Sequence, residues 1–200
     1  PCSPKSCWSG GADFVLRSDG ERAICRLAEA LRLGSDWRSI PSLCWREGGK
    51  IHQNEIGDLL SDVDGYGIPV VNSAGACFID HDAIVWGDPQ RNTRSYEVIA
   101  SRGCPFTCSY CCCVNLRRLL PRGIPGVRTR SVNSVIDELR EARRYCKKIV
   151  FVHFYDEIFP NLPGWVDEFA EKYEKYIHLP FTIWSHPKMV ELEMLKKLKQ

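Results

Sequence analysis

Residues 101–111 read Ser-Arg-Gly-Cys-Pro-Phe-Thr-Cys-Ser-Tyr-Cys, and they follow a stretch, 96–101, that predicts a β-strand. Cys104, Cys108 and Cys111 therefore have the spacing C-x3-C-x2-C. Three thiolates this close can ligate three irons of one [4Fe–4S] cubane, which normally takes four cysteine ligands. The fourth iron would stay open to a substrate or cofactor, as the open position of a catalytic zinc site does. The loop predicts an iron–sulfur centre with an open coordination position.

Other interpretations of this cysteine loop, residues 104–113, are weaker. Cys112 or Cys113 could supply a fourth ligand, but adjacent side chains usually diverge. A zinc site needs a second pair of ligands, and the histidines are scattered through the sequence. The C-x2-C-x2-C spacing of electron-transfer ferredoxins is absent. A buried cluster of inert thiols remains as the last alternative.

Cysteine content is the unusual feature of the composition. Eleven of 200 residues are cysteine, and five of them lie within residues 104–113, where neighbours cannot close disulfide loops of useful size. A reducing compartment, the cytoplasm, is expected. The six cysteines outside the loop are expected to be scattered or buried thiols: Cys2, Cys7, Cys25, Cys44, Cys77 and Cys146.

Net charge and hydropathy exclude two classes of protein. The formal charge of +2 argues against bulk electrostatic binding of nucleic acid or membranes, so no nucleic-acid partner is expected. Apolar runs fall far short of the ~18 residues that a membrane span needs, and no secretion signal is visible. Five arginines between residues 117 and 130 predict a solvated surface, with an anionic ligand as the alternative.

Downstream of the cysteine loop the pattern alternates between helix and strand. Helical and apolar periodicities predict a helix after Ser131, which would cap it, and then the elements 148–154 (strand), 165–177 (helix), 181–184 (strand) and 189–198 (helix). The near-continuous apolar run 148–154 is typical of a strand covered on both faces, so His153 is expected to be a satisfied core histidine. Three βα units in series predict a parallel sheet with right-handed crossovers, either open or part of a barrel.

Upstream, residues 13–17 predict a strand, which Asp19 follows as the expected cap of a helix with apolar residues at i, i+3, i+4 and i+7. Gly48 and Gly49 separate two short strands and predict a hairpin. Residues 62–69 predict a linker, and residues 70–95 an irregular crossover with a short strand near Ile84.

The strand followed by C-x3-C-x2-C, with the aromatic Tyr110 before the last cysteine, resembles the radical S-adenosylmethionine (SAM) enzymes. The resemblance implies that Cys104, Cys108 and Cys111 hold a [4Fe–4S] cluster, with Tyr110 near the cofactor. In that family SAM chelates the open iron, and reductive cleavage gives a 5′-deoxyadenosyl radical that abstracts a substrate hydrogen. The protein supplies orientation and excludes water. Catalytic residues in this chain stay unassigned.

Residues 154–159, Phe-Tyr-Asp-Glu-Ile-Phe, resemble the acidic segment of radical SAM proteins that carry an N-terminal cobalamin-binding domain. The resemblance implies that Asp156 or Glu157 accepts hydrogen bonds from the SAM ammonium. Because the two residues are adjacent, they are expected to alternate in direction, with at most one facing the cofactor. Arg128-Thr129-Arg130-Ser131 and Trp184-Ser185-His186-Pro187-Lys188 match the same group, and His186 becomes a candidate for lining the SAM cavity.

The fold that this resemblance implies is an α/β fold with a partial parallel (βα) barrel of the radical SAM type, of about three βα units. Residues 1–65 would be the tail of an α/β cobalamin-binding-like domain, 66–95 a linker, and 96–200 the N-terminal part of the barrel. Cobalamin-associated methyl transfer or a radical rearrangement of a small-molecule substrate is the expected chemistry, with flavodoxin or ferredoxin as reductant.

One departure from the group bears on the cofactors. The cobalamin motif D-x-H-x-x-G does not occur in the chain, so cobalamin is expected only in a longer parent protein. Two alternative functions stay open: a methylthiotransferase, which shares the cysteine spacing, and a non-catalytic iron–sulfur or zinc-binding module.

Overall fold

The computed structural model describes residues 11–70 and 75–199, so Cys2 and Cys7 lie outside the described residues. Its contacts divide the chain into two compact units. One unit comprises Pro1–Ser61 together with Cys104–Gly126, and the other comprises Asp62–Gly103 together with Val127–Gln200. No helix among the described residues is long and apolar enough to span a membrane.

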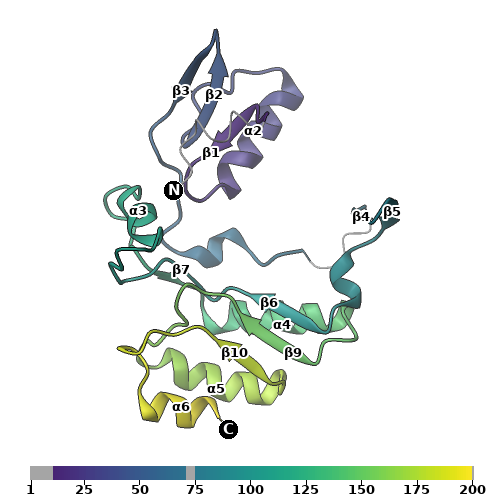
Figure 1. The fold of residues 1–200 in the computed structure, drawn as a ribbon, viewed down its shortest axis with the longest axis vertical. Coiled ribbons are helices and arrows are strands. Elements are labelled where there is room, and N and C mark those ends of the chain that lie inside the picture. The colour runs from purple at the N-terminus through teal and green to yellow at the C-terminus, as the bar shows by residue number, and fades with distance from the viewer. Residues whose placement is uncertain (1–10, 71–74, 200) are drawn as a thin grey trace. The chain divides into compact units, whose positions relative to one another are not determined.

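The first unit contains a small antiparallel sheet and a helix (Figure 1). The strands, in the order β1-β2-β3, are β1 (Phe14–Leu16), β2 (Leu43–Glu47) and β3 (Lys50–Gln53). Gly48 and Gly49 join β2 to β3 with φ angles of 57° and 75°, as a tight hairpin requires, so the predicted hairpin is confirmed.

Helix α2 (Glu21–Leu33) packs its apolar stripe on this sheet, where Leu27, Leu43 and Trp45 are buried. The predicted cap was wrong by one residue: the N-cap is Gly20, which has no side chain to accept a hydrogen bond, and not Asp19. The unit also contains the short helix α3 (Cys113–Arg118), which the sequence did not predict.

The second unit is built on a parallel sheet, as predicted. Its strands lie in the order β10-β9-β6, with β6 at Ser95–Val98, β9 at Phe151–Phe154 and β10 at Phe181–Ile183. The helices of the three βα units are α4 (Val132–Tyr145), α5 (Trp165–Tyr176) and α6 (Leu192–Leu198). Ser131 caps α4 as predicted, because its Oγ accepts a hydrogen bond from Ser134 N. Helix α6 begins three residues later than the predicted start at 189.

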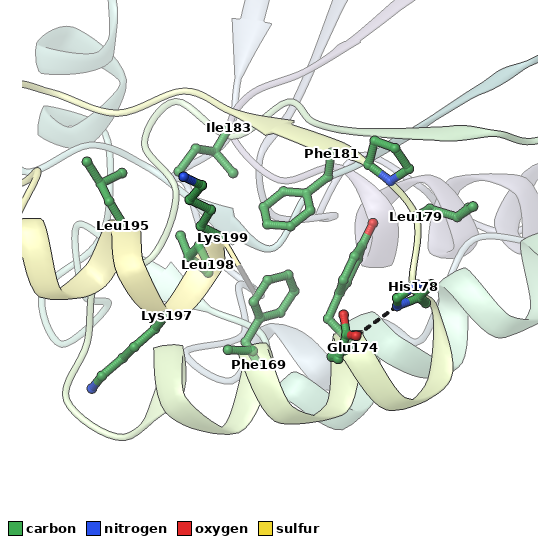
Figure 2. A pocket seen from close by; sticks show the side chains of 13 residues that line it. Phe169, Glu174, His178, Leu179, Phe181, Ile183, Leu195, Lys197, Leu198 and Lys199 are labelled. Carbon is green, nitrogen blue, oxygen red and sulfur yellow. Dashed lines mark ion pairs between the residues drawn. The ribbon is translucent and has the colours of Figure 1, made fainter.

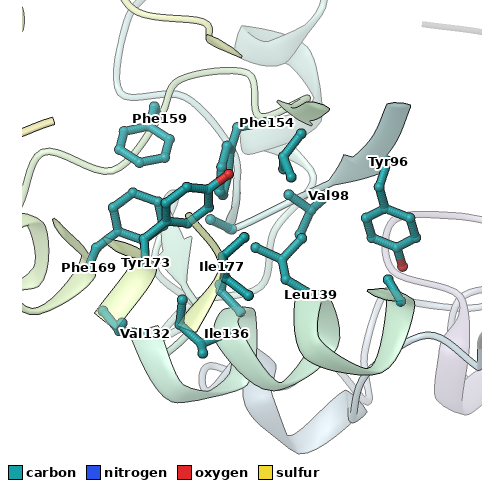
Figure 3. Packing of buried hydrophobic residues seen from close by; sticks show 14 of the residues in the cluster. Tyr96, Val98, Val132, Ile136, Leu139, Phe154, Phe159, Phe169, Tyr173 and Ile177 are labelled. Carbon is teal, nitrogen blue, oxygen red and sulfur yellow. The ribbon is translucent and has the colours of Figure 1, made fainter. Parts of the chain in front are cut away.

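The core of this unit lies between the sheet and helices α4 and α5 (Figure 3). Alternate residues of the strands face it, such as Val98 on β6 and Val152 and Phe154 on β9. The ring of Phe154 meets four other aromatic rings, those of Phe159, Phe169, Tyr173 and Phe181, at centroid distances of 5.1–6.2 Å. This packing fixes the sheet against its helices.

Two segments differ from the prediction. The predicted strand 96–101 is two strands: β6 pairs in parallel with β9, whereas β7 (Ser101–Arg102) pairs antiparallel with β8 (Arg128–Thr129). The expected strand near Ile84 is β5 (Ala83–Trp86), and it forms a hairpin with β4 (Cys77–Asp80). The 3-10 helices η1 (Val63–Tyr66) and η2 (Pro89–Asn92) complete this region.

The described cysteines outside the loop differ in burial, and each unit has one buried and one exposed thiol among them. Cys44 on β2 and Cys146 after α4 are buried, and burial raises the pKa of both thiols. Cys25 and Cys77 are exposed. Scattered thiols, some buried and some exposed, are what the sequence led us to expect.

Candidate functional site

The carboxyl ends of β6, β9 and β10 meet at one edge of the parallel sheet, where ligands bind in open α/β folds. The residues that follow these strands surround a hollow of about 570 Å³. We call it the edge hollow, and it is lined by Ile99, Ser101, Arg102, Tyr155, Asp156, Glu157, Trp184 and Ser185. Both acidic residues that the sequence selected therefore lie at one cavity.

Asp156 is buried, with only 3% of its surface exposed. Its Oδ1 accepts hydrogen bonds from Ser101 N and from Ser101 Oγ, the latter at 2.7 Å. Its Oδ2 is also buried and has no hydrogen-bond partner in the described part of the chain. Burial raises the pKa of Asp156, and the hydrogen bonds from Ser101 oppose that shift. A buried carboxylate oxygen without a donor carries a cost in free energy, and it belongs to a residue that lines the edge hollow.

Glu157 is exposed, and its Oε2 accepts a hydrogen bond from Gly103 N at 3.3 Å. Both carboxylates thus bind the short segment 101–103, but Asp156 is buried and Glu157 is exposed, which agrees with the expected alternation of adjacent side chains. Which of the two faces a cofactor stays a prediction. Gly103 has φ +91°, a conformation that favours glycine, at the point where the chain leaves this unit for Cys104.

The cysteine loop belongs to the first unit, and Arg117 of α3 holds its start. Arg117 Nη1 donates to the carbonyl oxygens of Cys104 (3.1 Å) and Pro105 (2.8 Å). Cys104, Cys108 and Cys111 are half-buried. Tyr110 is 91% exposed, and its hydrogen bond with Cys108 raises the pKa of the Tyr110 hydroxyl.

Among the described residues, one group of three potential metal ligands has all its ligand atoms within 4.8 Å of one another: Cys111, Cys112 and Cys113. Cys104 and Cys108 lie outside this group. The adjacent side chains converge instead of diverging. The divergence of adjacent side chains is a property of strands, and this segment is not a strand. Cys111 ends a turn in which its N–H donates to Cys108 O, and Cys112 has helical φ and ψ angles of −70° and −20°.

His186 is not among the residues that line the edge hollow, although Trp184 and Ser185 on the same segment are. Its Nδ1 accepts a hydrogen bond from Lys188 N at 3.1 Å. The Oγ of Ser185 is buried and has no hydrogen-bond partner in the described residues. Ser185 is therefore a polar group at the edge hollow to which the sequence analysis gave no role of its own.

His153 lies on the sheet face opposite the core, so the expectation of a core histidine was wrong. In register on that face are Glu97 of β6 and Thr182 of β10. Trp184 Nε1 donates to His153 Nε2 at 3.1 Å, and an indole N–H can only donate. His153 Nδ1 therefore carries the proton and donates to Thr182 Oγ1. The sequence signal that could have placed it is the one polar residue between the apolar Val152 and Phe154.

The predicted arginine surface is partly buried. Arg130 Nη1 forms an ion pair with Glu138 Oε2 at 2.5 Å, and Tyr96 donates its hydroxyl to Glu138 Oε1 at 3.0 Å. Arg130 also donates to the carbonyl oxygen of Ile99. These contacts tie α4 to the end of β6, so Arg130 positions the edge hollow instead of facing solvent or an anion.

A second cavity of about 530 Å³ lies between α5, β10 and α6 (Figure 2). Apolar side chains such as Phe169, Phe181 and Leu195 line it, and Glu174 Oε1 lies 2.9 Å from His178 Nδ1 at the end of α5. It contains no cluster of candidate ligands among the described residues, and the edge hollow is the better candidate site.

The chain is similar in sequence to one described methyltransferase. No protein-family model matches the chain. The uncharacterized methyltransferase PH0819 of Pyrococcus horikoshii is 30% identical over 147 residues, which is 74% of this chain and 28% of that protein.

The fold of the chain is similar to parts of two solved radical SAM enzymes. The radical SAM methyltransferase TsrM from Kitasatospora setae, with tryptophan and a SAM analogue bound, aligns with a TM-score of 0.64 and 18% identity over 94% of this chain and 35% of TsrM. The cobalamin-dependent radical SAM enzyme OxsB aligns with a TM-score of 0.64 and 16% identity over 99% of this chain and 27% of OxsB. The resemblance to radical SAM proteins of the cobalamin group is thus confirmed at the level of the fold, and the chain spans about a third or less of each of these proteins.

Proposed function

We propose that this chain is part of a cobalamin-associated radical SAM methyltransferase. One observation carries the proposal: the C-x3-C-x2-C loop begins at Cys104, the residue bonded to Gly103, and Asp156 and Glu157 hold segment 101–103 at the carboxyl edge of a parallel sheet. In this proposal residues 1–65 are the tail of a cobalamin-binding-like domain, 66–95 a linker, and 96–200 the first part of a (βα) barrel.

Cys104, Cys108 and Cys111 are proposed to ligate a [4Fe–4S] cluster. The donor set fits, because three half-buried thiols follow one another in a loop whose first carbonyl oxygens Arg117 holds. When bound and reduced, the cluster supplies the electron that cleaves SAM to methionine and a 5′-deoxyadenosyl radical. The chain's own part is to leave one iron without a protein ligand and to orient the cofactor.

The edge hollow is proposed to take part of SAM. The buried Asp156 Oδ2 has no donor in the described chain, and a cationic ammonium would satisfy it with a charge-assisted hydrogen bond. Glu157 lies at the same cavity and adds a second negative charge. Tyr110 and His186 complete the proposed SAM contacts on the basis of the motif alone.

Methyl transfer to a small molecule is proposed from the relatives. PH0819 is described as a methyltransferase, and TsrM is a radical SAM methyltransferase solved with tryptophan and with cobalamin. We extend that chemistry to the full-length parent of this chain, with cobalamin bound by that parent and an electron carrier such as flavodoxin or ferredoxin as reductant.

Metal analysis after anaerobic reconstitution with iron and sulfide tests the proposal. The unsubstituted chain should bind about four irons, the content of one cubane. Cys104→Ala, Cys108→Ala and Cys111→Ala should each abolish iron binding, whereas Cys112→Ala and Cys113→Ala should retain it. Iron loss in either of the last two variants would refute the three-ligand assignment.

A further inference from the structure

The adjacent thiols Cys111, Cys112 and Cys113 form a group that the proposed cluster does not explain, because the cluster uses only Cys111. All three Sγ atoms lie within 4.8 Å of one another. We propose that, before an iron–sulfur cluster is assembled, these three thiols bind one Zn²⁺ ion. The two metal centres would share Cys111, so they would exclude each other. The competition between them rests on the proposed function, whereas the zinc site itself does not.

The distances fit a single ion. Zinc binds thiolate sulfur at about 2.3 Å in tetrahedral geometry, so two thiolates on one zinc ion are about 3.8 Å apart. The three Sγ atoms lie within 4.8 Å of one another. Side-chain rotations that move these sulfur atoms by about 1 Å bring them to the separation that zinc requires. In a cubane each thiolate binds a different iron, so two such thiolates lie farther apart than two thiolates on one zinc ion. As they are placed, the three adjacent thiols suit a single ion better than three corners of a cluster.

The backbone fixes this convergence. Cys111 N donates to Cys108 O at 3.1 Å, which closes the turn that brings the chain to Cys111. Cys112 O accepts hydrogen bonds from Asn115 N (2.9 Å) and Leu116 N (3.0 Å), so Cys112 and Cys113 are held at the first turn of α3. The three thiols are presented by backbone that is already hydrogen-bonded, and metal binding does not have to order it.

The ligand chemistry selects the metal. Three thiolates are soft ligands, which favour Zn²⁺ over Mg²⁺ or Ca²⁺. Each thiol that binds zinc releases its proton to solvent. The three sulfur ligands leave the fourth tetrahedral position of the ion to a water molecule. Cys112 is exposed and Cys111 and Cys113 are half-buried, so the ion can enter from solvent.

Zinc titration of the iron-free chain under reducing conditions, against a chromophoric chelator, tests the site. One equivalent should bind to the unsubstituted chain. Because loss of an outer-shell partner alone costs about 10–100-fold in metal affinity, Cys112→Ala and Cys113→Ala should each weaken zinc binding about 100-fold or more. Cys104→Ala and the exposed control Cys25→Ala should leave it unchanged. Weak zinc binding to the unsubstituted chain, or loss of binding in Cys104→Ala instead of in Cys112→Ala, would overturn the proposal.

Cobalt substitution gives an independent readout. Co²⁺ in the same site should show thiolate-to-metal charge-transfer absorption, which should fall in Cys112→Ala and persist in Cys25→Ala. The zinc-loaded chain should resist reconstitution with iron, and the double variant Cys112→Ala/Cys113→Ala should take up iron whether or not zinc is present. Normal zinc binding in a chain that never takes up iron would refute the proposed function and leave the zinc site standing.

Discussion

The two faces of the parallel sheet differ although the same strands build them. On β9, Val152 and Phe154 are buried against α4 and α5, whereas His153 between them lies on the opposite face and hydrogen-bonds with Trp184 and Thr182. One face packs the core, and the other face together with the carboxyl edge carries the polar groups that the proposed SAM site would use. Substitutions on the two faces should therefore have separable effects.

The largest effect on stability should come from the covered face. Phe154 is 0% exposed and surrounded by aromatic rings, so Phe154→Ala should lower the free energy of unfolding by about 3–5 kcal/mol. The neighbouring substitution His153→Ala removes two hydrogen bonds on the open face and should cost about 1 kcal/mol. Denaturant unfolding of both variants measures the difference. Equal losses would contradict the division of the sheet into two faces.

The next largest effect should be on ligand binding at the carboxyl edge. Loss of a charge-assisted hydrogen bond costs about 1.5–3 kcal/mol, so Asp156→Asn or Glu157→Gln should weaken SAM binding about 10–100-fold in the reconstituted full-length protein. Iron content should stay normal. Glu171→Gln, an exposed carboxylate on α5, is the matched control. Unchanged affinity in both edge variants would leave the two carboxylates as anchors of segment 101–103 alone.

Asp156 should also make stability depend on pH, by a smaller amount because the hydrogen bonds from Ser101 offset part of its burial. Since burial raises its pKa in the folded state, the folded chain holds a proton that the unfolded chain releases. Stability should therefore fall as the pH rises from the usual carboxyl range through the raised pKa. Asp156→Asn should remove this fall when unfolding is measured across that range. A variant with the same pH dependence as the unsubstituted chain would show that another group is responsible.

The smallest effect should come from the cap of α4, a helix that covers the apolar face. Ser131→Ala removes the acceptor for Ser134 N and should cost about 1 kcal/mol, whereas Ser131→Gly should cost only a few tenths. Thermal or denaturant unfolding can resolve the two. A larger loss in the glycine variant than in the alanine variant would argue against side-chain capping.

Most regular elements were predictable because periodicity and turn chemistry are local. The stripe of α4, its cap Ser131 and the Gly48-Gly49 turn all lie within a few residues of the signal that predicts them. Segment 96–102 was harder, since nothing in its apolar run shows that β6 pairs with β9 and β7 with β8. Pairing partners far apart in sequence decide where such a strand divides.

The candidate site was predictable in its residue types and less so in its geometry. The motif selected Asp156 and Glu157, and both line the edge hollow. Ser101 and Ser185 stand in the quoted segments but received no role, because a serine by itself carries no pattern and the importance of these two comes from burial beside the same cavity. The convergence of Cys111, Cys112 and Cys113 depends on helical backbone angles that strand rules do not describe.

The central claim is that the C-x3-C-x2-C loop holds a cluster with one iron open to SAM. Electron paramagnetic resonance of the reduced, reconstituted chain tests it most directly, with spectra recorded before and after SAM is added. We expect a cluster signal that changes with SAM and is absent from Cys104→Ala. A signal that SAM leaves unchanged, in protein shown to contain about four irons per chain, would contradict it.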